Sequence, residues 1–73
     1  MTEVKPGIYR HYKGMRYRVL LEATHSETGE RVVVYQCLYG DYSHWVRPKA
    51  MFMESVDIAG KAVARFEFVP SED

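Results

Sequence analysis

Short segments rich in valine, tyrosine and phenylalanine alternate with glycines along the chain, and this pattern limits the fold more than any other feature. The glycines stand at positions 7, 14, 29, 40 and 60 of 73 residues. Valine and aromatic residues favour the pleated surface of a β-sheet, whereas glycine permits the positive φ angles of tight turns. The chain carries no long apolar repeat of helical period. The pattern therefore predicts an all-β domain.

The segments between the glycines predict five to six antiparallel strands. We expect strands at residues 7–12, 15–24, 31–38, 44–47, 52–58 and 61–69, with one helical turn over 48–51 that begins at a proline. Segment 15–24 alternates with a period of two, with one face formed by Met15, Tyr17, Val19, Leu21 and Ala23 and the other by Arg16, Arg18, Glu22 and Thr24. Segment 31–38 is apolar on both faces and is expected to be the most buried strand.

So few short strands cannot make two complete sheets. We expect one strongly bent antiparallel sheet that curls into a small SH3-like barrel or roll, with an OB-like barrel as the alternative. The length allows a single domain over residues 1–73, folded over about 7–69, with flexible ends at 1–6 and 70–73. The alternation places Tyr17 and Tyr35 in the core.

Composition excludes several classes of protein. The single cysteine, Cys37, cannot form an internal disulfide or complete a thiolate zinc site, so we expect a reduced, cytoplasmic domain. The first residues carry no signal-peptide pattern, and the longest uncharged run, residues 32–40, is too short to span a membrane. Ten basic residues balance ten acidic ones, which argues against a general binder of nucleic acid.

Several short motifs are specific in combination. They are Gly7-Ile-Tyr-Arg-His-Tyr-Lys-Gly14, His25-Ser-Glu-Thr28, Val34-Tyr35, Leu38-Tyr-Gly-Asp41, Trp45-Val-Arg-Pro48, Met51-Phe52 and Arg65-Phe-Glu67. Together they resemble a short bacterial family catalogued as domain of unknown function 1653, from Gly7 to about Phe68. The resemblance implies an SH3-type barrel, in agreement with the residue pattern. It implies no activity and no catalytic residue.

Aromatic and polar residues around the turn after residue 38 form the first candidate site. We predict a binding groove formed by Tyr9, His11, Tyr12, Tyr39, Asp41, Tyr42, Trp45 and Arg47. Tryptophan, tyrosine and arginine are common energetic anchors of interfaces. The alternative is that these rings complete a core too small to close with aliphatic residues. We expect Arg47 to pair with Asp41 as a structural clamp; alternatively, its planar guanidinium faces a ligand carboxylate or phosphate.

A basic strand face is the second candidate. Arg16 and Arg18 share one face of their strand, and Arg10 lies in the neighbouring strand. Such a stripe with tyrosines nearby is typical of a surface that binds single-stranded nucleic acid. The alternative is a solvated face whose cations pair with glutamates on neighbouring strands. With zero net charge we expect the solvated face, and therefore no nucleic-acid partner.

Nothing in the sequence predicts catalysis. The three histidines, Cys37 and Asp41 do not follow the spacing of a metal motif, and no nucleophile stands near a base and an orienting group. We therefore expect no enzyme, no metal and no cofactor. The prediction is a non-catalytic binding or adaptor domain that presents an aromatic groove to a protein segment. Single-stranded nucleic-acid binding and the sensing of a small metabolite are the alternatives, and the pattern indicates no oligomeric state.

Overall fold

The structure, a computed structural model, describes residues 4–70 as seven strands and one helical turn. The strands are β1 (Gly7–His11), β2 (Arg16–Thr24), β3 (Arg31–Cys37), β4 (His44–Pro48), β5 (Ser55–Ile58), β6 (Lys61–Ala64) and β7 (Phe66–Phe68), and the helical turn is α1 (Lys49–Phe52). The predicted all-β class with a single short helix is therefore confirmed. One strand more than the upper end of the prediction appears because the last predicted strand is divided in two.

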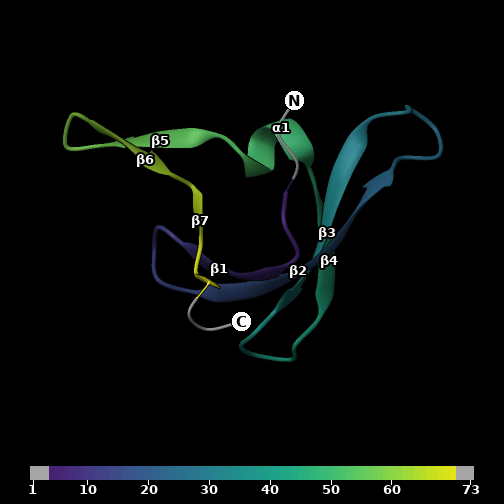
Figure 1. The fold of residues 1–73 in the computed structure, drawn as a ribbon, viewed down its shortest axis with the longest axis horizontal. Helices are drawn as coiled ribbons and strands as arrows, with labels where there is room; N and C mark the ends of the chain where they lie inside the picture. Colours follow the sequence, from purple (N-terminus) through teal and green to yellow (C-terminus); the bar gives the residue numbers. More distant parts are fainter. Residues whose placement is uncertain (1–3, 71–73) are drawn as a thin grey trace.

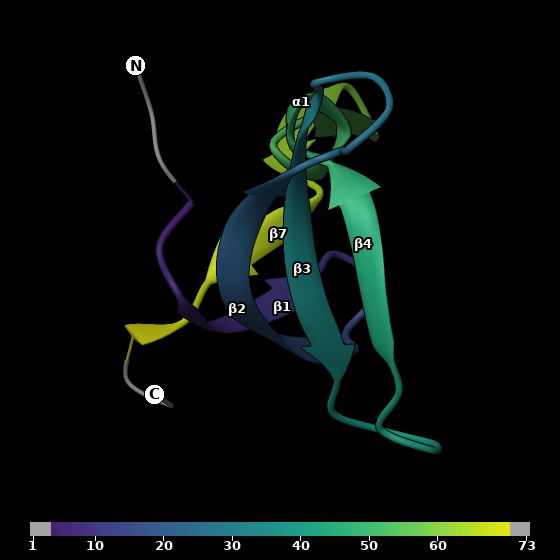
Figure 2. The same ribbon diagram turned by 90° about the vertical axis from the view of Figure 1, so that its right-hand side faces the viewer.

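Five strands form one curved antiparallel sheet in the order β4-β3-β2-β1-β7. Figure 2 shows β2, β3 and β4 side by side, and Figure 1 shows how the sheet bends beneath α1. The sheet stays open, with β4 and β7 at its edges. This curled, open sheet agrees with the predicted small SH3-like roll.

The core is built mainly from aromatic rings that five elements bring together. Phe52 of α1 stacks on Phe66 of β7 with ring centroids 4.3 Å apart, and Tyr9, Tyr17 and Tyr35 surround this pair. All five residues are buried, as predicted for the tyrosines of β2 and β3. Because each aromatic side chain buries a large apolar area, this cluster closes the core of a short chain without a disulfide.

The strand β2 contains a bulge between Val19 and Leu21. Val19 pairs with Tyr35 before the bulge, whereas Glu22 pairs with Val33 after it. Since paired residues share a face, Glu22 points to the core side and Leu21, which is 52% exposed, points outward. The predicted alternation is therefore wrong from Leu21 onward, because a bulge inserts one residue and exchanges the two faces.

The predicted strand over residues 61–69 is divided at Arg65. The backbone N–H of Arg65 donates to the carbonyl oxygen of Glu54 at 3.1 Å, and its carbonyl oxygen accepts the N–H of Tyr12 at 3.0 Å. The chain thereby leaves its pairing with β5 and joins β1 as β7. As a result β6 is exposed throughout, while Phe66 is buried.

The helical turn α1 begins one residue later than predicted and closes one side of the core. It runs from Lys49 to Phe52, directly after Pro48, and the N–H of Met53 donates to the carbonyl oxygen of Lys49 at 3.0 Å. Phe52, which was predicted to begin a strand, is 2% exposed and fills the core from this turn. Within residues 4–70 no helix is long and apolar enough to cross a membrane.

The predicted flexible ends fall only partly within the described residues. Positions 1–3 and 71–73 lie outside them. Val4, by contrast, is buried in the core, and the carbonyl oxygen of Lys5 accepts the Tyr9 hydroxyl at 2.9 Å. At the other end, the N–H of Val69 donates to the carbonyl oxygen of Ile8 at 2.9 Å. The folded part therefore begins earlier than the predicted residue 7.

Strands β5 and β6 form a separate two-stranded hairpin that projects from the sheet (Figure 1). Its turn, Ala59-Gly60, has φ angles of 52° and 83°. Two consecutive positive φ angles match the right-handed twist of a tight hairpin. Ile58 and Val63 on this hairpin are 44% and 36% exposed. The hairpin is therefore an apolar arm with little cover.

Candidate functional site

The residues of the predicted groove do not all lie on one surface. Tyr9 is 7% exposed, its ring contacts that of Phe52 edge-on with centroids 5.4 Å apart, and its hydroxyl donates to the Lys5 carbonyl. Burial is the main cause that raises the pKa of Tyr9. Tyr9 is therefore a core residue, which is the alternative that the sequence left open for these rings.

Three exposed aromatic residues lie in and after the loop between β3 and β4. Tyr39, Tyr42 and Trp45 are 43%, 53% and 56% exposed, and we call them the aromatic loop surface. The Trp45 indole N–H donates to the Ser43 hydroxyl oxygen at 2.8 Å, which holds the ring in place. The loop extends beyond the ends of the two strands (Figure 2). This surface offers large apolar area together with polar edges.

Tyr39 ties the aromatic loop surface to the core. Its hydroxyl lies 2.9 Å from that of Tyr17, and the two ring centroids are 5.6 Å apart. Burial, assisted by this hydrogen bond, raises the pKa of Tyr17 well above its ordinary value. Tyr17 therefore stays a neutral phenol that can donate to or accept from its neighbour.

Arg47 does not form the predicted clamp with Asp41. An oxygen of Asp41 accepts the N–H of Ser43 at 3.1 Å, which stabilises its own turn. Arg47 lies on the core side of β4, opposite Val33, with its guanidinium carbon 5.6 Å from the ring centroid of Phe66. Within residues 4–70 it has no carboxylate partner, and its Nε is buried without a hydrogen bond. The clamp prediction was wrong because Asp41 is satisfied locally.

His11, the last residue of β1, contacts the same core ring, and Tyr12 follows it in the chain. The His11 ring centroid lies 5.0 Å from that of Phe66 and 4.5 Å from that of Tyr12, and its Nδ1 accepts the N–H of Lys13 at 3.1 Å. Burial is the first cause that lowers the pKa of His11, followed by the charges of Lys13, Arg65 and Arg47. His11 therefore lies where several cations meet.

Arg65 is a further residue of this region that the site prediction missed. Its Nη2 lies 3.0 Å from a carboxylate oxygen of Glu54, whereas its Nε is buried without a hydrogen bond. The sequence carried no signal for this role, because it depends on the bend between β6 and β7. His11, Arg47 and Arg65 around Phe66 are called the arginine site below.

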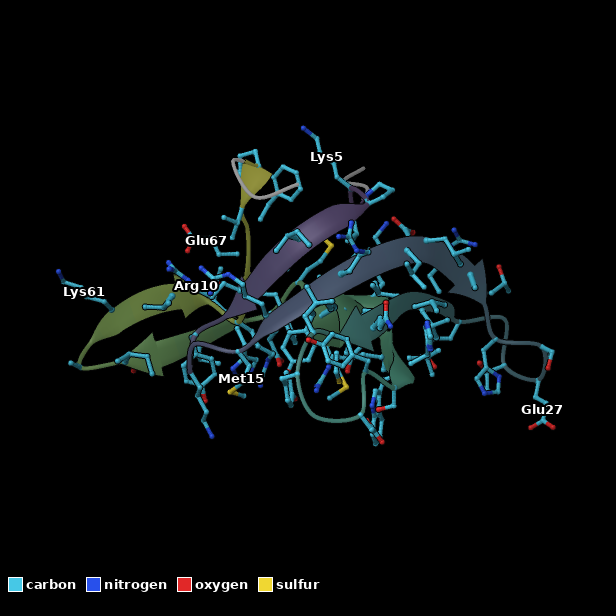
Figure 3. All side chains as sticks on the ribbon, turned by 90° about the horizontal axis from the view of Figure 1, so that it is seen from below. Lys5, Arg10, Met15, Glu27, Lys61 and Glu67 are labelled. Carbon is cyan, nitrogen blue, oxygen red and sulfur yellow. The ribbon has the colours of Figure 1, made fainter. Side chains whose placement is uncertain are left out.

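The predicted basic face does form on the opposite side of the sheet. Arg10 pairs across strands with Arg16, and Arg18 follows two residues later. However, Arg10 forms an ion pair with Glu67 at 3.1 Å, and Figure 3 shows the two side chains close together. Arg16 and Arg18 also have interaction partners. The charge of Arg10 is therefore compensated by a glutamate on a neighbouring strand, which is the pairing expected on a solvated face.

An open hollow of about 380 Å³ lies between the turn after β1 and strand β6. Its lining consists of Arg10, His11, Tyr12, Lys13, Gly14, Val63, Ala64 and Glu67. Since the Arg10–Glu67 ion pair occupies one wall, the hollow is polar and electrically mixed. Among the described residues no group of His, Cys, Asp and Glu is arranged to hold a metal ion.

Comparison with known proteins agrees with the sequence motifs. The chain matches the family model described as "Protein of unknown function (DUF1653)" over residues 7–68. It is similar to the crystal structure of a DUF1653 protein from Bordetella bronchiseptica, with 39% sequence identity, a TM-score of 0.84, and coverage of 92% of this chain and 88% of that chain. No curated protein matches it. The chain therefore belongs to the DUF1653 family.

Proposed function

We propose that this protein is a non-catalytic binding domain that holds a protein segment against the aromatic loop surface and Arg47. The observation that carries the proposal is the state of Arg47, whose guanidinium has no carboxylate partner within residues 4–70 although it lies beside the core. A cation that the fold itself leaves uncompensated, next to exposed rings, is suited to contact with a partner.

The arrangement of β4 supports a segment in extended conformation. β4 is an edge of the five-stranded sheet, and Trp45 and Arg47 share its core-side face because they pair with Tyr35 and Val33. An extended peptide that adds to such an edge gains backbone hydrogen bonds, while alternate side chains meet the residues of one face. A segment along β4 would therefore place its side chains against Trp45 and Arg47.

A peptide selection tests the proposal. Random dodecapeptides are selected on immobilised wild-type protein, and the affinities of the enriched peptides are measured for Trp45→Ala and for Ile58→Ala, a matched exposed apolar residue on the separate hairpin. We expect Trp45→Ala to weaken binding at least about tenfold, as for a buried interface anchor. Amide chemical shifts should move at residues 39–47. Enrichment of no peptide, or shifts confined to another face, would contradict the proposal.

The two alternative functions stay predictions. Fluorescence anisotropy with short single-stranded oligonucleotides at low and moderate salt tests the basic face, with Arg10→Gln as the informative variant. Binding that is absent, or that does not depend on salt, excludes this alternative. Ligand-induced thermal shift is the corresponding screen for small metabolites.

A further inference from the structure

The arginine site has an excess of positive charge on the core side of the sheet. The charges of Lys13, Arg47 and Arg65 all lower the pKa of His11, and within residues 4–70 only Arg65 of the two arginines is paired with a carboxylate, that of Glu54. Glu54 is on the exposed side of this pair, with a side chain 54% exposed against 25% for Arg65. The protein as a whole has no net charge, so this local excess is a property of the site.

The geometry of Arg47 fixes what kind of group fits. Its guanidinium lies over the Phe66 ring, and its buried Nε makes no hydrogen bond, so the charge is partly desolvated without compensation. The remaining guanidinium nitrogens form a planar fork. A carboxylate offers two oxygens at the matching spacing and compensates the charge in the same contact.

We propose that the arginine site recognises the side-chain carboxylate of an aspartate or glutamate in the bound segment, with Arg47 as the direct donor and Arg65 as the second cation. This inference rests on the proposed function. Because β4 is an open edge, a segment that continues past both ends of β4 brings a side chain, and not a chain end, to Arg47.

A nucleic-acid phosphate fits the same site less well. A single strand requires a track of cations along its backbone. The exposed arginines Arg10, Arg16 and Arg18 lie on the opposite face of the sheet. Arg31, which is exposed on the same face as Arg47, forms an ion pair with Glu22. The positive charge at Arg47 therefore fits a single anionic group and not a continuous phosphate backbone.

Matched peptide pools test the inference. Three pools of dodecapeptides, random and neutral at all but two central positions, are passed over the immobilised protein. The acidic pool carries Asp or Glu at the two central positions, and the amide pool carries Asn or Gln there. The third pool carries the same amides and has a free C-terminal carboxylate. The first two have blocked ends. We expect wild-type protein to retain the acidic pool about tenfold more than the amide pool. Arg47→Gln should bring this ratio close to one, Arg47→Lys should retain part of it, and Arg10→Gln on the opposite face should leave it unchanged.

The outcomes separate the two proposals. Equal retention of the acidic and amide pools by wild-type protein, with loss of both in Trp45→Ala, overturns carboxylate recognition and leaves the binding function standing. Retention of the terminal-carboxylate pool alone, or an Arg47-dependent capture of a single-stranded oligonucleotide instead, also overturns it. Retention of no pool overturns both. The amide spectrum of each variant shows whether it is folded. Arg47→Lys conserves the charge, so partial retention by this variant separates a loss of charge from a loss of structure.

Discussion

Glu22 accepts the backbone N–H of Val4 at 2.8 Å and thereby ties the start of the folded chain to the central strand β2. The same carboxylate lies 3.2 Å from Lys49 Nζ and 3.4 Å from Arg31 Nη2. The hydrogen bond from Val4 is the largest cause that lowers the pKa of Glu22, followed by Lys49 and Arg31, whereas partial burial opposes them. One carboxylate therefore joins β2, α1, β3 and the N-terminal segment.

The first prediction is that Glu22→Gln destabilises the protein in a pH-dependent way. Because the folded pKa of Glu22 lies below its unfolded value, its stabilisation is complete above the unfolded pKa and is lost as pH falls through the folded one. The melting temperature of Glu22→Gln should fall below wild type at pH 7, and the difference should shrink toward pH 3. Glu67→Gln, from an exposed ion pair, is the control and should change little. An equal loss in both variants would contradict the role of Glu22.

The second prediction concerns Arg47 and Asp41, which act independently. Since they form no ion pair, a double-mutant cycle with Arg47→Gln and Asp41→Asn should give a coupling free energy below about 0.5 kcal/mol. Arg47→Lys alone should lose less than roughly 1 kcal/mol, the scale of a partly exposed cation–π contact. Urea unfolding measures both values. A coupling free energy of more than about 1 kcal/mol would show that Arg47 and Asp41 do form an ion pair.

The third prediction is an asymmetry in the Tyr17–Tyr39 hydrogen bond. Tyr39→Phe leaves the hydroxyl of the buried Tyr17 without its partner and should lower the free energy of unfolding by roughly 1 kcal/mol. Tyr17→Phe leaves the exposed hydroxyl of Tyr39 to water and should have a smaller effect. Tyr42→Phe, at a ring that is 53% exposed, is the matched control and should behave as wild type. The reverse order of the two effects would show that Tyr17 is solvated.

The fourth prediction is a loss of stability on mild acidification that depends on His11. Its pKa is lowered by burial and by Lys13, Arg65 and Arg47, and the rings of Tyr12 and Phe66 cover it. The unfolded state therefore binds more protons once pH falls below about 6.5, the ordinary value for histidine. The free energy of unfolding should be constant above that pH and should decrease below it, until the folded pKa is passed.

His11→Gln should remove this decrease, because glutamine does not titrate. Urea unfolding between pH 5.5 and pH 8 measures the slope for wild type and variant. His25→Gln is the control, since His25 is exposed in the loop between β2 and β3. If the decrease in the free energy of unfolding persisted in His11→Gln and disappeared in His25→Gln, it would contradict the assignment to His11.

Much of the fold was predictable because it depends on residue type. Aromatic and β-branched segments between glycines marked nearly every strand, and Pro48 marked the start of α1. What the sequence missed depends on backbone geometry. The bulge before Leu21 and the bend at Arg65 involve no glycine or proline, so nothing in the residue pattern announced the change of face or of strand partner.

The site was predictable in part for the same reason. The aromatic residues Tyr42 and Trp45 were singled out by residue type, but the sequence left open whether their rings line a groove or complete the core, and the structure shows both rings exposed. The partner of Arg47 was not predictable, because an arginine near an aspartate in sequence suggests an ion pair, whereas strand alternation directs Arg47 to Phe66. Arg65 was missed because its role depends on two distant elements meeting at one bend.

The hairpin of β5 and β6 has a consequence for how the molecule opens. An isolated two-stranded hairpin is marginally stable in water. The side chains of β5 and β6 are largely exposed, and the two strands pair only with each other. In hydrogen exchange, the amides of the hairpin should therefore lose protection in a local opening that leaves β1, β2 and β3 intact. Proteases should cut first near Gly60. The five-stranded sheet would then stay folded while the β5–β6 hairpin unfolds on its own.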